Sequence, residues 1–391
     1  MNNLLKHKFS YHQVTEFTFI FILLLFPKID IIEIPNYYQG IRIEDLIIVY
    51  IFISLYISNS LIIKKNDFGY LFYIFFFISL ISILHGALYF NQKWITIPRY
   101  LEYIIILIYF NRNNPNLETI FFILKLYLVI NFIFVIFQKF ELVGEFSSLG
   151  YTSPKNLTDH RPNGLTGGPW ELSNCSAIIF FALLLDKKQS NFLKNFYSIL
   201  AILLIIITES RTILVSFLLA YFLYLYLQKV NKSKFLLLLL FLTFMLLLFF
   251  YIDFNFFERF SIYLELLDML KKFVFYQEKP DYEILDGRLW SMALRFHHWA
   301  ILYEQFLQNE LTILFGTGYT SLYYESTILR ILFGTGIFGL IFVFYGIRKI
   351  PLHILFLFFV SGLSLDLLLS FKIFFTILLY FYIEKKNDYR N

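Results

Sequence analysis

Long apolar runs, separated by short polar segments, constrain this sequence more than any other feature. A run of about 17–25 apolar residues is long enough to cross a lipid bilayer as a helix. Hydrophobic residues make up 59% of the chain and charged residues only 16%, against about 45–50% and about 25% in soluble domains. The sequence therefore predicts an all-α, polytopic integral membrane protein, with a single membrane domain over residues 1–391.

The apolar runs predict about twelve transmembrane helices. Their expected positions are residues 14–29, 45–63, 69–88, 95–110, 118–140, 169–186, 194–209, 212–228, 234–252, 327–347, 350–365 and 367–383. The first and the eleventh are short or interrupted.

Lys and Arg are distributed unevenly between the loops. Cytoplasmic loops of membrane proteins carry an excess of these residues. If the amino terminus is cytoplasmic, every loop on that side contains Lys or Arg, as at Lys64, Arg112, Lys188 and Arg348. Because the number of spans is even, both termini are then expected in the cytoplasm.

The longest predicted loop, residues 253–326, lies on the opposite side of the membrane and is acidic on balance. Its pattern predicts two amphipathic helices, at 256–276 and 287–308, joined by a polar stretch. Such helices lie on the membrane surface or cover a cavity. The two halves of the chain share no inverted repeat, which counts against a secondary transporter.

The stretch HRPNGLTGGPWELSN, residues 160–174, concentrates glycine, proline and charge at the start of a predicted span. Pro169 suits the first position of a helix and Glu171 the third. The N–H groups of a helix N-terminus favour an anion such as phosphate, and Arg161 would add a bidentate donor. The alternative is that Glu171 only caps the helix and that Arg161 only pairs with a lipid headgroup.

Three further segments place arginines near the outer face. Arg211 follows the tight turn between two spans, where snorkelling to the interface is the alternative to function. Arg288 and Arg295 fall on one face of the second amphipathic helix and would grip a diphosphate, unless that face is simply solvated. Arg330 lies inside the tenth span and needs a partner, either Glu325 or a substrate phosphate; a structural ion pair is the alternative.

The predicted site is therefore an arginine-rich site at the outer face, with no metal and no cofactor. The sequence has no metal-ligand pattern, no phosphate-binding loop and no dinucleotide fingerprint. It also lacks the basic soluble surface that a nucleic-acid partner would need. Arginines from four segments would neutralise the leaving diphosphate of a lipid-linked donor, and Glu171 or Glu325 would act as general base on the acceptor hydroxyl.

Five motifs, read in order along the chain, resemble those of the bacterial O-antigen polymerase and ligase superfamily. The resemblance covers roughly residues 140–350, with the long outer loop just before the tenth span. The motifs are RPNGLTGGPWELS, TESRTILVSFLLA, GRLWSMALRF, FGTGY and ESTILRILFGTGIFGL.

The resemblance implies a metal-independent, inverting membrane glycosyltransferase of the bacterial inner membrane. Such an enzyme acts on undecaprenyl-diphosphate-linked oligosaccharides at the periplasmic face, without a cofactor. It relies on periplasmic arginines, which here match Arg161, Arg211 and Arg288. A chain-length regulator and a flippase are the implied protein partners.

Within this superfamily, the residues just before the tenth span are expected to distinguish a polymerase from a ligase. Ligases typically carry a functional histidine there, whereas this chain has YYES at residues 323–326, with His297 and His298 well upstream. We therefore expect the polymerase, with Glu325 as the base. The alternatives are the ligase, which transfers the glycan to lipid A-core, and a lipid-linked oligosaccharide flippase, which would carry charges deep in a central cavity.

Overall fold

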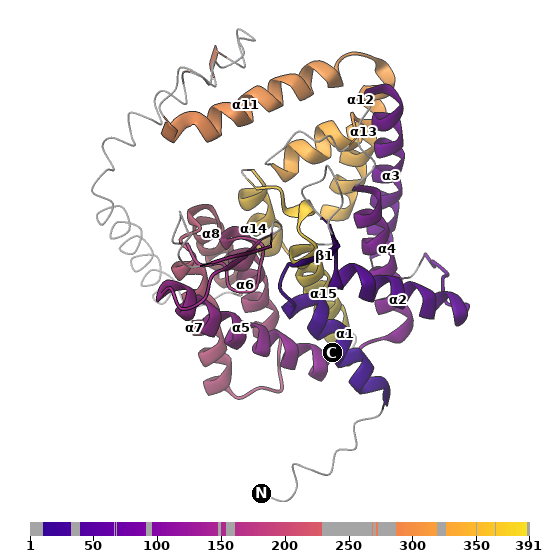
Figure 1. Cartoon of the computed structure of the whole chain (residues 1–391). Coiled ribbons are helices and arrows are strands. Elements are labelled where there is room, and N and C mark those ends of the chain that lie inside the picture. The colour runs from indigo at the N-terminus through magenta and orange to yellow at the C-terminus, as the bar shows by residue number, and fades with distance from the viewer. Residues whose placement is uncertain are drawn as a thin grey trace, which may run out of the picture. The chain divides into compact units, whose positions relative to one another are not determined.

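The computed structural model is mostly helical (Figure 1). It describes residues 11–32, 40–65, 67, 69–90, 96–147, 150–153, 161–228, 268, 271–272, 287–318, 326–348, 350–363 and 365–388. The predicted ninth span, residues 234–252, and nearly all of the predicted amphipathic helix at 256–276 lie outside the described residues.

Helices account for most of the described residues, and short strands for a few. The helices are α1 (Tyr11–Leu25), α2 (Ile43–Ile57), α3 (Tyr70–Phe90), α4 (Thr96–Asn113), α5 (Leu117–Lys139), α6 (Pro169–Leu184), α7 (Asn191–Ile207), α8 (Arg211–Leu227), α11 (Gly287–Phe306), α12 (Glu310–Phe315), α13 (Thr327–Ile347), α14 (Leu352–Gly362), the 3-10 helix η3 (Leu367–Leu369) and α15 (Phe371–Asp388). Two antiparallel strand pairs complete the fold: β1 (Asp30–Ile32) with β2 (Ile41–Arg42), and β3 (Glu145–Ser147) with β4 (Gly150–Thr152).

Among the described residues, three helices are long and apolar enough to cross a bilayer: α3, α5 and α13. They coincide with the predicted spans at 69–88, 118–140 and 327–347. Helices α1, α6, α7, α8 and α14 are apolar but shorter, and they overlap five more predicted spans. This pattern is compatible with an all-α membrane protein, while the number of twelve spans stays a prediction.

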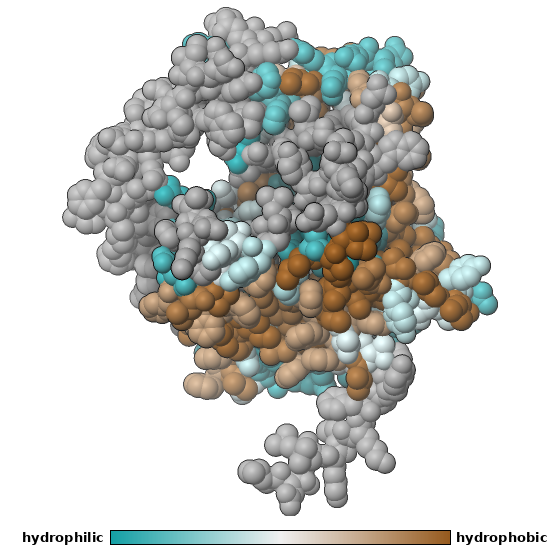
Figure 2. Space-filling view, viewed as in Figure 1, coloured by the Kyte–Doolittle hydropathy of each residue, from teal (hydrophilic) through white to brown (hydrophobic). Residues whose placement is uncertain are grey.

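The contacts divide the chain into two compact units, described separately below. Unit 1 comprises residues 1–70, 101–215 and 368–391, and unit 2 comprises residues 71–100 and 216–367. In unit 1, α6 packs against α7 and α15, and α5 packs against α1 and α7. Residues 171–183 of α6 are all buried, so α6 is the central helix of this unit. Apolar side chains dominate the surface over α1, α5 and α7 (Figure 2).

Unit 1 has polar contacts at both ends of α6. At one end, which we term the Glu171 end, Lys28 pairs with Glu171 in the first turn of α6. At the other, which we term the Asp186 end, Lys125 near the start of α5 pairs with Asp186 just after α6. Helices α5 and α6 therefore run in opposite directions, as the alternating topology requires. The compartment that each end faces stays a prediction.

In unit 2, α13 is broken at Gly336, whose backbone has φ 64° and ψ −162°. A break in a helix frees carbonyl groups, which need other donors in an apolar environment. The segment after α12 supplies them: the Thr317 N–H donates to Phe333 O (2.7 Å) and the Gly318 N–H donates to Gly334 O (3.2 Å). The two segments are therefore joined by backbone hydrogen bonds at the break.

Glycine is required on both sides of this junction. Gly316 has φ 81°, and a Cβ there would overlap the backbone of Gly334. A Cβ at Gly336 would lie 2.5 Å from Leu314 O, closer than real Cβ contacts. His85 of α3 adds a side-chain contact, since its Nδ1 donates to Gly316 O over 3.0 Å. The FGTGY and FGTGIFG motifs thus form one close backbone contact.

The junction predicts that Gly336→Ala destabilises the protein. A side chain at positive φ costs about 1–2 kcal/mol, and the overlap with Leu314 adds to this. Gly346→Ala, in the same helix with nothing within 4 Å of its Cβ position, is the matched control; it should be neutral or stabilising by up to about 1 kcal/mol. Thermal unfolding of the purified protein in detergent measures both. Similar melting temperatures for the two variants would contradict the junction.

Candidate functional site

The Glu171 carboxylate binds three partners at the Glu171 end. It is 0% exposed. Its Oε1 lies 2.7 Å from Lys28 Nζ and also accepts a hydrogen bond from Ser370 Oγ. Its Oε2 accepts from the Gly167 N–H over 2.6 Å. One carboxylate thus ties the end of α1 and the start of α15 to the turn that begins α6.

A second buried cation completes this cluster. Lys372 is 1% exposed, and its Nζ donates to the carbonyl oxygens of Phe26 and Leu165, each over 2.7 Å. It also interacts electrostatically with Glu171. Buried charges are tolerated when they are paired or hydrogen-bonded. Lys28 and Glu171 form an ion pair, and Lys372 is hydrogen-bonded to two carbonyl oxygens. We term Lys28, Glu171, Ser370 and Lys372 the buried charge cluster.

The loop that carries Arg161 is fixed by amide side chains of α5. Gln138 Oε1 accepts from the backbone N–H groups of Asn163 (3.1 Å) and Gly164 (2.8 Å). Asn131 Oδ1 accepts from the Leu165 N–H over 2.9 Å. Gly164 has φ 58°, and a Cβ there would overlap the Asn131 amide. The PNGL sequence therefore forms a rigid, buried turn directly after an exposed arginine.

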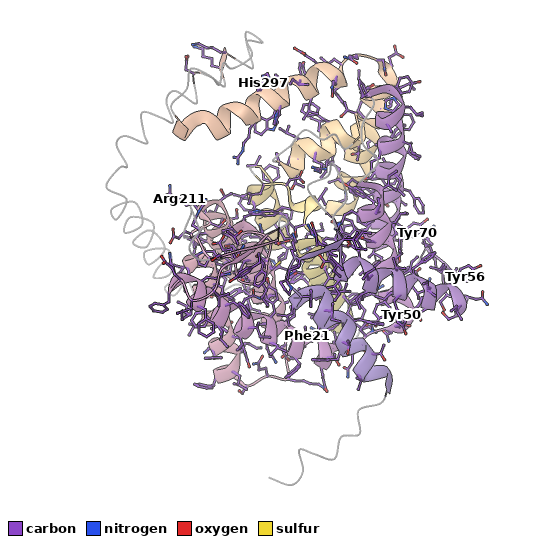
Figure 3. The ribbon with its side chains drawn as sticks, viewed as in Figure 1. Phe21, Tyr50, Tyr56, Tyr70, Arg211 and His297 are labelled. Atoms are coloured by element: carbon purple, nitrogen blue, oxygen red, sulfur yellow. The ribbon has the colours of Figure 1, made fainter. Side chains whose placement is uncertain are left out.

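Arg161 and Arg211 both lie at the Glu171 end of unit 1, and both are exposed. Arg211 begins α8 (Figure 3). The turn before it is joined to its neighbours twice: Ser173 of α6 hydrogen-bonds Thr208, and Lys139 pairs with Glu209 over 2.8 Å. Two of the five predicted arginines are therefore brought to the same end by identifiable contacts.

The N-terminus of α6 already has an anion beside it, the carboxylate of Glu171. The Gly167 N–H points to Glu171, and the Glu171 N–H donates to Gly168 O over 3.1 Å. Pro169 has no N–H to offer. The amides that were expected to face a phosphate are therefore largely occupied, which leaves the charge of Arg161 and Arg211 as the main attraction for an anion at this end.

The other predicted arginines belong to unit 2. Arg288 lies in the first turn of α11, and its side chain is outside the described residues. Arg295, two turns along α11, is half-buried, and burial lowers the pKa of its guanidinium from the usual value. Since Arg161 and Arg211 are in unit 1, the convergence of these arginines on one substrate stays a prediction.

Arg330 is 3% exposed and forms an ion pair with Asp366. Of the partners considered from the sequence, Glu325 lies outside the described residues. Asp366 follows α14 in a short segment whose backbone is also bonded to α13, since the Thr327 N–H donates to Leu365 O over 3.0 Å. This pair therefore joins the start of α13 to the end of α14.

Sequence reasoning did not identify Lys28, Lys372 or Asp366 as members of these contacts. One signal was available for all three: an ionisable group beside or within an apolar run requires a partner. That rule says a partner exists but does not identify it. Within the described residues, no group of three or more His, Cys, Asp or Glu side chains is placed to hold a metal ion.

Comparisons with known proteins add no identification. No family model matches the sequence, and no curated protein matches it.

The buried charge cluster predicts a large effect of unpairing Glu171. Lys28→Met should cost about 3–5 kcal/mol, because it removes a partner of a fully buried carboxylate. The double variant Lys28→Met/Glu171→Met should lose less than the single variant, because no unpaired carboxylate remains. Thermal unfolding in detergent provides the comparison.

The matched control is Lys188→Gln, which breaks a pair of similar length. Lys188 Nζ lies 2.6 Å from Glu118, but both side chains are about two-thirds exposed. Such a pair contributes about 0–1 kcal/mol, so the melting temperature should hardly change. If Lys28→Met were as mild as this control, the buried pair would not be holding the α6 turn.

Proposed function

We propose that the chain is an O-antigen polymerase, a glycosyltransferase that joins undecaprenyl-diphosphate-linked oligosaccharide repeat units. In this proposal it lies in the bacterial inner membrane with twelve spans, both termini are cytoplasmic, and the Glu171 end faces the periplasm. A chain-length regulator and a flippase would be its protein partners. The order of the five motifs along the sequence supports the assignment to this superfamily.

The observation that carries the proposal is the pair of exposed arginines at the Glu171 end. Arg161 precedes a turn held by Gln138, and Arg211 follows a turn held by Lys139 and Ser173. A guanidinium group can donate two parallel hydrogen bonds to the oxygens of one phosphate. Arginines on fixed backbone segments lose less freedom when they bind an anion, so they suit the electrostatic stabilisation of a leaving group.

The proposed reaction is a single displacement with inversion. The acceptor hydroxyl, at the non-reducing end of a new lipid-linked repeat unit, attacks the anomeric carbon of the growing glycan. The bond from that carbon to the diphosphate oxygen breaks as the new glycosidic bond forms, and its electron pair leaves with the lipid diphosphate. Arg161, Arg211 and Arg288 neutralise that diphosphate, while a carboxylate takes the hydroxyl proton.

The described contacts bear on one of the two candidate carboxylates, Glu171. Glu171 already accepts bonds from Lys28, Ser370 and the Gly167 N–H, and it is fully buried. A general base needs an oxygen within reach of the hydroxyl. We therefore assign Glu171 to positioning the α6 turn, and we propose Glu325 as the base. Arg330, paired with Asp366, is assigned to holding α13 in place.

Glycan profiles of a deletion strain test the proposed reaction. Loss of a polymerase should leave lipid A-core carrying one repeat unit, and the wild-type gene should restore long chains. Arg161→Ala, Arg211→Ala and Arg288→Ala should each fail to restore them, because the leaving diphosphate loses a counter-charge. The control is Arg348→Ala, an exposed arginine on the predicted cytoplasmic side, which should restore them fully.

Two outcomes would contradict this proposal. A deletion profile with no attached glycan at all would indicate the ligase. Full restoration by all three arginine variants, at expression equal to wild type, would show that these arginines are not needed to neutralise the diphosphate.

A separate complementation assay tests the base. Glu325→Gln keeps the size of the side chain but cannot accept the hydroxyl proton, so chain growth should fall by about 10²–10⁴-fold. Glu325→Ala should be equally defective. Normal long-chain glycan from both variants would exclude Glu325 from this role.

A further inference from the structure

The β3–β4 hairpin, which follows α5 at the Glu171 end, exposes an aromatic ring that the proposed reaction does not use. Tyr151 of β4 is 53% exposed. It lies opposite Phe146 of β3 in the antiparallel pair, and the two ring centroids are 5.4 Å apart. Phe146 in turn contacts Phe134 of α5, with ring centroids 6.3 Å apart. A row of three aromatic side chains therefore runs from α5 to an exposed ring.

The hydroxyl of Tyr151 is bound to the hairpin itself. Its oxygen accepts a hydrogen bond from the Gly144 N–H over 2.9 Å. The ring also lies close to this glycine, since a Cβ at Gly144 would be 3.0 Å from the Cζ atom of Tyr151. A tyrosine that anchors a protein in the membrane interface keeps its ring in lipid and its hydroxyl in water. Here the hydroxyl fixes the ring in one orientation, and the ring stays open to a ligand.

The hairpin shares its support with the turn that follows Arg161. Gln138, whose Oε1 holds that turn, also donates from Nε2 to Gly144 O over 3.0 Å. Asn163 Nδ2 donates to Phe146 O over 2.7 Å. Arg161 is only two residues before Asn163, and two residues of extended chain span at most about 7 Å. The hairpin and the turn are therefore held by the same two buried amide side chains.

We propose that Tyr151 is a stacking platform for a pyranose ring of the lipid-linked glycan, at the same end as the diphosphate that Arg161 and Arg211 would hold. One face of a pyranose ring consists of C–H groups, and their weakly positive hydrogens pack on the negative face of an aromatic ring. Such a contact needs a ring that is both fixed and open, and Tyr151 meets both conditions. The inference rests on the proposed function, because it takes a glycan to be the ligand at this end.

The test measures the Kd of free glycan for the purified full-length protein in detergent, by isothermal titration calorimetry. The probe is the long-chain glycan released by mild acid from the lipopolysaccharide of the wild-type strain. Tyr151→Leu keeps an apolar side chain but removes the ring, so the Kd should rise by about 3- to 12-fold, as expected for the loss of an aromatic contact. Tyr151→Phe should bind within about 2-fold of wild type. Both variants lose the bond from Gly144, so their difference isolates the ring.

Phe140→Leu is the matched control for anchoring in the membrane. Phe140 lies directly after α5 at the same end and is 71% exposed, but it is not part of the hairpin. Its replacement should change the Kd by less than about 2-fold. In the deletion strain, Tyr151→Leu should give shorter chains than wild type, whereas Tyr151→Phe and Phe140→Leu should restore wild-type lengths. Elution from a sizing column checks the fold of each variant.

Any one of four results would overturn the platform. The first is a wild-type protein that does not bind the glycan, and the second is an unchanged Kd for Tyr151→Leu. Equal losses in Tyr151→Leu and Tyr151→Phe would assign the effect to the hydroxyl. Equal losses in Tyr151→Leu and Phe140→Leu would indicate anchoring in the membrane. If the Kd values are as expected but the deletion strain keeps its long chains, the platform stands and the proposed polymerase fails.

Discussion

The ion pair between Lys28 and Glu171 is the contact on which the Glu171 end depends. Its two partners come from the segment after α1 and from the first turn of α6, and Ser370 adds the start of α15. Without Lys28, the fully buried carboxylate would be left with hydrogen bonds and the more distant charge of Lys372. Because removing one member of a buried pair is far costlier than never having the pair, the cluster fixes one arrangement of these helices.

Three glycines, one in unit 1 and two in unit 2, let a neighbouring group approach the backbone closely. In unit 1, Gly164 allows the turn to receive the Gln138 and Asn131 side chains. In unit 2, Gly316 and Gly336 allow α12 to meet the break in α13. Both are motif regions, so the motifs reflect backbone geometry at least as much as chemistry.

Much of the helical pattern could be predicted from the sequence, because apolar runs and the polar, proline or glycine residues that bound them are local signals. Pro169 marked the start of α6, and the run at 118–140 matched α5 almost residue for residue. The partners within the site could not be predicted in this way. Ser370 and Glu171 are 199 residues apart, and Asp366 and Arg330 are 36 apart. A buried charge needs a partner, but the partner can come from any part of the chain. A single sequence does not show which residue it is. Glu171 illustrates this. Its place in the first turn of α6 could be inferred from the local sequence, but its bonds to Lys28 and Ser370 depend on tertiary packing.

Exposure decides what each ion pair of unit 1 is suited to do. The Lys28 and Glu171 side chains are 11% and 0% exposed, so a ligand cannot replace either partner without desolvating itself. The Lys188 and Glu118 side chains are 68% and 66% exposed, so water already competes with the pair and an anion can take the place of the carboxylate. A Lys–Glu ion pair is thus a fixed structural contact at the Glu171 end and a weak, solvent-accessible contact at the Asp186 end. In the proposed reaction, the diphosphate would therefore be held by the exposed Arg161 and Arg211 rather than by the buried charge cluster, which keeps the α6 turn in place.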